Sequence, residues 1–159
     1  MSSADKSWWG PRIWRLFHCL AEQSDRVDAA GAWRLALQLT CDVLPCERCR
    51  LHFSEKVRRL RIPVDGPNIQ STMREFMWAS HQGTTAEQFP KETLTDVYGG
   101  ARDARLDECR ALLEEVVAAW SRDNALDRFR TVFLPKWRRA ILHLIHVLLL
   151  PDPVRIKRR

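Results

Sequence analysis

Apolar residues recur every three or four positions along most of this chain, and that spacing restricts it to helices. The clearest case is the stretch 102–123, where Leu106, Leu113 and Trp120 fall two turns apart on one face. Strand signals are nearly absent, because no Asn-Gly or Asp-Gly turn joins two strand-like runs. The sequence therefore predicts an all-α fold. The helices are expected over residues 11–23, 28–43, 45–62, 69–81, 102–123 and 135–150, with one short helix inside 84–100.

Proline and glycine divide the chain. Residues 62–68 read as a turn, and Pro11 and Pro45 are expected in the first turns of their helices, where a missing N–H costs nothing. Gly99-Gly100 marks a boundary between a core at 8–100 and a helical extension at 101–150, followed by a basic tail at 151–159. The helix at 135–150 is apolar nearly all round, so we expect it to be buried or to form a homodimer interface.

Composition narrows the functional classes. The net charge of +6 suits an acidic partner or an anionic cofactor, but a basic balance alone is weak evidence for nucleic acid, and no nucleic-acid-binding motif accompanies it. The longest apolar run, 140–150, is too short to span a bilayer. The polar start, 1–6, is not followed by an apolar segment, so no secretory signal peptide is predicted. We therefore expect neither a nucleic-acid partner nor a membrane span.

The stretch with the strongest chemical signal is Pro45-Cys46-Glu47-Arg48-Cys49. A helix N-terminus lowers the pKa of a nearby thiol, which favours a redox-active dithiol. Two alternatives remain. The cysteines are two small core thiols, or Cys41, Cys46, Cys49 and His52 form a three-Cys, one-His zinc site. The dithiol interpretation is preferred, because a zinc site so compact normally uses glycine-rich loops, and this segment has none.

Flanking motifs strengthen that interpretation. Residues 9–18 read W-G-x-x-x-W-x-x-x-H, residues 45–53 read P-C-x-x-C-R-x-H-F, and a predicted helix ends at His81. In this order and at these separations, about Trp8 to Tyr98 resembles the FAD-linked sulfhydryl oxidases of the Erv/ALR family. The resemblance implies a four-helix bundle with a short fifth helix holding FAD, with the helices after Gly100 as an addition.

The same resemblance assigns roles to individual residues. Cys46 would exchange disulfides with substrate, and Cys49 would lie next to the flavin and pass electrons to it. His81 would lie near the adenine, although the sequence His81-Gln82-Gly83-Thr84-Thr85 departs from the family's H-N-x-V-N pattern. The full set of expected cofactor-binding residues is Trp9, Arg12, Trp14, His18, His52, His81 and Lys91.

The implied activity is oxidation of protein dithiols to disulfides, with O₂ reduced to H₂O₂. Short members with a lone Cys-x-x-Cys resemble those encoded by large DNA viruses, which implies a host cytoplasm, nucleus or virion, with the mitochondrial intermembrane space as the alternative. Two other functions stay open: a zinc-stabilised helical interaction module, and a catalytically weak relative that only binds partners.

The other three cysteines, Cys19, Cys41 and Cys109, are expected to be small buried hydrophobes. The alternative for Cys41 and Cys109 is that one of them shuttles electrons or pairs across a dimer. The odd total of five cysteines does not suggest a closed disulfide framework.

Overall fold

The computed structural model describes residues 1–26, 29–63, 66–82 and 89–150, and within these ranges it contains helices and loops but no strand. The all-α prediction is therefore confirmed. The helices are α1 (Lys6–Glu22), α2 (Ala29–Val43), α3 (Glu47–Arg59), α4 (Gly66–Gln82), the 3-10 turn η1 (Lys91–Thr93), α5 (Leu94–Tyr98), α6 (Arg102–Arg122), α7 (Arg128–Thr131) and α8 (Phe133–Leu149).

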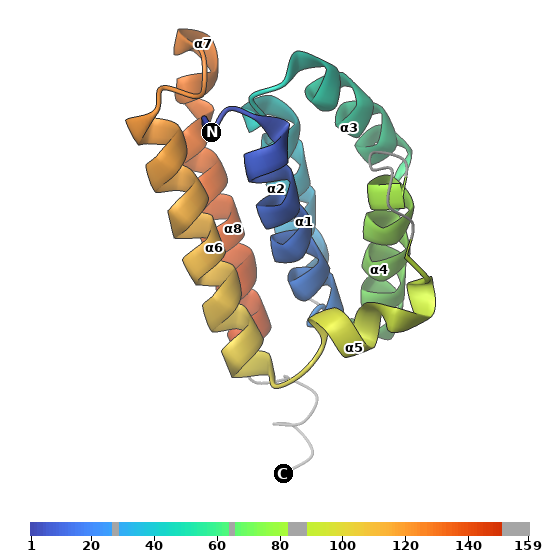
Figure 1. The fold of residues 1–159 in the computed structure, drawn as a ribbon. Helices are drawn as coiled ribbons and strands as arrows, with labels where there is room; N and C mark the ends of the chain where they lie inside the picture. The colour runs from blue at the N-terminus through green and yellow to red at the C-terminus, as the bar shows by residue number, and fades with distance from the viewer. Residues whose placement is uncertain (27–28, 64–65, 83–88, 151–159) are drawn as a thin grey trace.

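The long helices form three layers, with α1 and α2 between the other two (Figure 1). On one side lie α3 and α4, and on the other lie α6 and α8. The predicted four-helix bundle corresponds to α1–α4, with α5 as the short fifth helix. The additional helices α6 and α8 pack along α1 and α2, so the central layer is covered on both sides.

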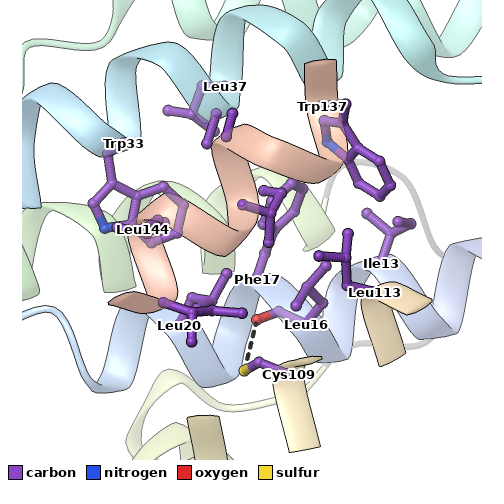
Figure 2. Close-up of a cluster of buried hydrophobic side chains, with 14 of the residues drawn as sticks. Ile13, Leu16, Phe17, Leu20, Trp33, Leu37, Cys109, Leu113, Trp137 and Leu144 are labelled. Atoms are coloured by element: carbon purple, nitrogen blue, oxygen red, sulfur yellow. Dashed lines mark hydrogen bonds between the residues drawn. The ribbon is translucent and has the colours of Figure 1, made fainter. Parts of the chain in front are cut away.

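This central position explains the burial of α1. The sequence predicts one apolar face, but every residue from Leu16 to Glu22 is buried. The Phe17 ring lies 6.2 Å from that of Trp33 and 6.3 Å from that of Phe53, so it contacts both neighbouring helices of the bundle. On the other side Leu16 faces Cys109 of α6 (Figure 2).

The apolar character of α8 is accounted for within the chain. Trp137, Ile141 and Leu144 are fully buried, and the exposed side of the helix carries His143 and His146. Trp137 stacks on Trp120 of α6 with ring centroids 5.6 Å apart. An interface with a second copy is therefore not needed to cover this helix, and the homodimer stays a prediction.

Four predicted helix starts are wrong, including that of α8, which begins at Phe133 rather than at Pro135. The first helix begins at Lys6, upstream of Pro11, because the N–H groups of Trp8 and Trp9 both donate to the carbonyl of Asp5 and start the helix there. The third begins at Glu47, which places Pro45 before the helix rather than in its first turn. The fourth begins at Gly66, inside the predicted turn.

The Gly99-Gly100 pair turns the chain from α5 into α6. A Cβ at Gly99 would lie 2.4 Å from the Thr95 carbonyl oxygen, and Gly100 has φ +128°, a backbone conformation that favours glycine. One continuous apolar core nevertheless runs through both segments, 8–100 and 101–150.

Two features fall outside the described residues: the basic tail at 151–159 and residues 83–85 of the loop after His81. Among the helices that are described, none has the length and apolar content needed to cross a bilayer.

Candidate active site

Cys46 is the N-cap of α3. Its backbone is extended, with φ −98° and ψ 120°, and its Sγ accepts a hydrogen bond from the backbone N–H of Cys49 at 3.2 Å. A thiol therefore stands where a helix usually carries a Ser, Thr, Asp or Asn oxygen. Because the N–H groups of the first turn have no partners within the helix, this position favours a negatively charged sulfur.

The hydrogen bonds at the cap decide the pKa of Cys46. Partial burial raises it, but hydrogen bonds from the Cys49 side chain and from the backbone N–H groups of Cys49 and Arg48, together with the charge of Lys6, lower it by more. The pKa of the Cys46 thiol is therefore below its usual value, which makes Cys46 the more stable thiolate of the pair and the better leaving group.

Cys49 shows the opposite shift. Burial, then the hydrogen bond with Cys46 and the negative charge that Cys46 carries as a thiolate, raise the pKa of Cys49 to about 11. The two thiols therefore titrate as one unit, in which Cys46 loses its proton more readily than Cys49.

Cys46 and Cys49 both line a cavity of about 360 Å³ between α1 and α3, which is within the size range of sites for cofactors and small molecules. Its walls are mostly aromatic and aliphatic. The lining residues are Lys6, Trp9, Ile13, Trp14, Phe17, Thr40, Leu44, Cys46, Arg48, Cys49, His52, Phe53, Lys56 and Ser80.

Helical spacing explains the wall that α3 provides. Cys49, His52, Phe53 and Lys56 are three, four and seven residues apart, so they share one face of the helix. Lys56 was not predicted from the sequence, although it continues the spacing of the other three residues.

The charged residues at the cavity are all basic. Lys6, Arg48 and Lys56 line it, and none of the described residues that line it is Asp or Glu. Burial and the nearby charge of Lys6 lower the pKa of Lys56, whose Nζ donates to the Ser80 carbonyl at 3.3 Å. Cations held close together in this way favour an anionic ligand.

Two predicted cofactor residues lie at the cavity from α1. Trp9 is buried, and its Nε1–H donates to the Ala4 carbonyl at 3.2 Å. Trp14 is half-buried and stacks on His81, with ring centroids 4.7 Å apart and planes 10° from parallel. Both indoles present apolar surface to the same cavity as the two cysteines.

His18 and His81 meet each other, but neither lines the cavity. Nε2 of His18 and Nδ1 of His81 are 3.0 Å apart, and His18 also stacks on Tyr98 at 4.6 Å. Burial, and then the proximity of His81, lower the pKa of His18 to about 3, and burial lowers that of His81. Both imidazoles also contact the Trp14 ring, with centroids 4.7 Å away for His81 and 6.2 Å away for His18.

Arg12 and Lys91 lie away from the cavity. Arg12 pairs with Glu115 of α6 at 2.9 Å and lies over the Trp8 ring at 4.1 Å. Lys91 is exposed and pairs with Glu75 at 2.8 Å. Their charges are engaged by carboxylates, and the structure does not bring either residue to the cysteine pair.

His52 lines the cavity and is exposed to solvent. The zinc alternative required it to meet Cys41, Cys46 and Cys49. Across residues 1–26, 29–63, 66–82 and 89–150, no group of three or more His, Cys, Asp or Glu side chains is placed to hold a metal ion.

A second, open groove of about 620 Å³ lies between α3 and α4 and shares Lys56 and Ser80 with the cavity. It adds Arg59 and Arg61 to the basic residues nearby, together with one carboxylate, Glu75. Lys56 therefore lines both hollows, whereas Arg59 of the groove is paired with Glu55 at 2.8 Å.

Comparisons with known proteins identify no relative. No model of a known protein family matches the chain, no curated protein is similar to it, and no solved structure matches its fold.

Proposed function

We propose that this chain is an FAD-linked thiol oxidase that converts protein dithiols to disulfides and reduces O₂ to H₂O₂. The observation that carries the proposal is the Cys46–Cys49 pair at the start of α3, with opposite pKa shifts and both sulfurs on an aromatic, basic-lined cavity. Ordinary core thiols have neither the helix-cap hydrogen bonds nor the open cavity.

Disulfide exchange follows from the two thiols. A substrate thiolate attacks Sγ of Cys46 in the 46–49 disulfide, which forms a mixed disulfide and releases Cys49 as a thiolate that takes up a proton. The second substrate thiolate then attacks the sulfur of its own chain, which forms the substrate disulfide and releases Cys46 as a thiolate. The low pKa of Cys46 assists this release, because its cap hydrogen bonds stabilise the departing charge.

The residues at the cavity fit FAD in two respects. The aromatic side chains Trp9, Trp14 and Phe53 offer flat apolar surface beside the cysteines, as an isoalloxazine ring requires. Lys56 lines both this cavity and the adjoining groove, which provides a positive charge for a pyrophosphate that extends from one to the other. When bound, the flavin would accept the electron pair of the 46–49 dithiol and pass it to O₂.

The remaining predicted residues take other roles in this proposal. His18 and His81 hold Trp14 in position instead of lining the cavity. Arg12 is no longer expected to contact the cofactor, since it pairs with Glu115 of α6. Lys91 pairs with Glu75, which lines the groove, so it lies near the groove rather than at the cysteine pair.

The test is purification of the full chain, addition of FAD and removal of the unbound excess. We expect a yellow protein with about one flavin per chain and oxygen uptake on a dithiol. Cys46→Ser and Cys49→Ser should keep the flavin and lose the oxygen uptake. A protein that binds flavin but oxidises no dithiol would support the partner-binding alternative, and a colourless protein with stoichiometric zinc would support the zinc module.

A further inference from the structure

Cys19 and Cys109 form a second thiol pair, separate from the residues that line the cavity. Cys19 lies on α1 and Cys109 on α6, both are fully buried, and their side chains are hydrogen-bonded to each other. Neither residue lines the cavity that borders Cys46 and Cys49.

The position of Cys109 against α1 is fixed by a second contact. Its Sγ lies 3.8 Å from the carbonyl oxygen of Leu16, one helical turn before Cys19 (Figure 2). The sulfur of α6 is therefore held against the turn of α1 that carries the other thiol, in the packed core between the two helices.

The pKa shifts of the two thiols run in opposite directions. The hydrogen bond from Cys109 lowers the pKa of Cys19 more than burial raises it, and the charges of Arg15 and Arg105 lower it further against Glu108. The same hydrogen bond, then burial, raises the pKa of Cys109. The contact places two sulfurs with opposite pKa shifts next to each other, and of the two Cys19 loses its proton more readily.

We propose that Cys19 and Cys109 are a site of disulfide formation that fastens α6 covalently to α1, with a peroxide as oxidant. The Cys19 thiolate attacks a peroxide oxygen and becomes a sulfenic acid as the O–O bond breaks, and the other oxygen leaves, with a proton, as water. Cys109 then attacks the sulfenic sulfur, which forms the S–S bond and releases a second water. In total, two thiols and one H₂O₂ give one disulfide and two waters.

This proposal does not depend on the proposed oxidase activity, since the peroxide can be supplied from outside. Its structural consequence is large, because the bond would close a loop that contains α2, α3, α4 and α5 and tie the central layer to the α6–α8 layer. A crosslink across a loop this long restricts the unfolded chain strongly.

The first test is peptide mapping of the full chain carrying Cys46→Ser and Cys49→Ser, which leaves Cys19, Cys41 and Cys109. One sample is treated with H₂O₂ in the folded state, and another is refolded from guanidinium in its presence. Both are alkylated in denaturant and cut with trypsin. We expect peptide 16–26, which holds Cys19, to be joined to peptide 106–110, which holds Cys109, while peptide 35–48 carries an alkylated Cys41.

The second test measures thermal unfolding of the same two-serine chain before and after reduction. Reduction should lower the Tm by about 5–15 °C. Adding Cys109→Ser should abolish this redox dependence even if it also lowers the Tm itself, and adding Cys41→Ser should leave it in place. A merely structural role of the two thiols as core residues would give no redox dependence.

Two results would overturn the proposal. One is recovery of peptides 16–26 and 106–110 as separate alkylated species in both the folded and the refolded samples. The other is a crosslink from either peptide to the Cys41 peptide instead. Loss of flavin binding or of oxidase activity would leave this proposal intact and count only against the proposed function.

Discussion

The molecule holds two thiol pairs with similar electrostatics and different access. In each, a sulfur–sulfur hydrogen bond accompanies one lowered and one raised pKa: Cys46 against Cys49, and Cys19 against Cys109. The first pair is half-buried at a helix start and borders a cavity, whereas the second is fully buried between two helices. Thiol pKa therefore does not separate the two pairs. Access decides which one can exchange disulfides with another protein.

The largest expected effect comes from the accessible pair. Cys46→Ser or Cys49→Ser should reduce oxygen uptake on a dithiol by about a thousandfold or more, because each removes one sulfur of the exchanging disulfide. The measurement is oxygen consumption by flavin-loaded protein at equal flavin content. Retention of more than a tenth of the wild-type rate in either variant would place the redox centre elsewhere.

The burial of His18 on α1 also predicts that the free energy of unfolding decreases at acid pH. His18 has a pKa of about 3 when folded and 6.5 when unfolded, so the unfolded chain binds more protons between these values. The contribution of His18 to the free energy of unfolding should be complete above pH 6.5. At lower pH it should decrease by up to about 1.4 kcal/mol per pH unit. Denaturant titrations between pH 7 and about pH 5 measure this slope. In His18→Gln the slope should flatten, and in His146→Gln, at an exposed histidine, it should match the wild type.

Removing a basic residue at the cavity should have a smaller effect than removing either Cys46 or Cys49. Lys56 lines both the cavity and the groove, so Lys56→Ala should weaken FAD binding about tenfold, with a smaller difference at high salt. Equilibrium titration of apoprotein with FAD measures this. The matched control is Arg58→Ala on the same helix, because Arg58 is exposed and lines neither hollow. Equal losses in the two variants would show a general charge effect.

The smallest expected effect belongs to the buried pair. Cys109→Ser should leave the rate of small-dithiol oxidation within about twofold of the wild type, because Cys109 is fully buried and does not line the cavity. The assay is the oxygen uptake used for Cys46 and Cys49, run well below the Tm of the variant. A drop comparable to that of Cys49→Ser would erase the distinction between the pairs and make Cys109 part of the electron path.

The spacing of apolar residues predicted the helices well, because it follows which residues are buried. The positions of proline predicted the helix starts poorly. The N–H groups of Trp8 and Trp9 start α1 at Lys6 despite Pro11, and Pro45 precedes α3 instead of opening it. That shift matters for the site, since it makes Cys46 the N-cap. The burial of α1 on both sides was not predictable from α1 alone, because it depends on where α6 packs.

The candidate site was predicted in part. The motifs indicated Cys46, Cys49, Trp9, Trp14 and His52, and the structure places all five at one cavity. Arg12 and Lys91 were assigned to the cofactor by their positions near the motifs. Their carboxylate partners, Glu115 and Glu75, lie on other helices, so the pairing could not be predicted from the motifs. The contact between Cys19 and Cys109 had no sequence signal, because 89 residues separate them and only the packing of α6 on α1 brings them together.

The most direct test of the central claim is anaerobic reduction of the bound flavin. FAD-loaded wild-type chain is mixed with a dithiol in the absence of oxygen, and the flavin absorbance is followed. Rapid bleaching in the wild type, its loss in Cys49→Ser and its persistence in Cys109→Ser are the predicted result. A chain that takes up no FAD, or a bound flavin that a dithiol bleaches equally fast without Cys49, would contradict the account.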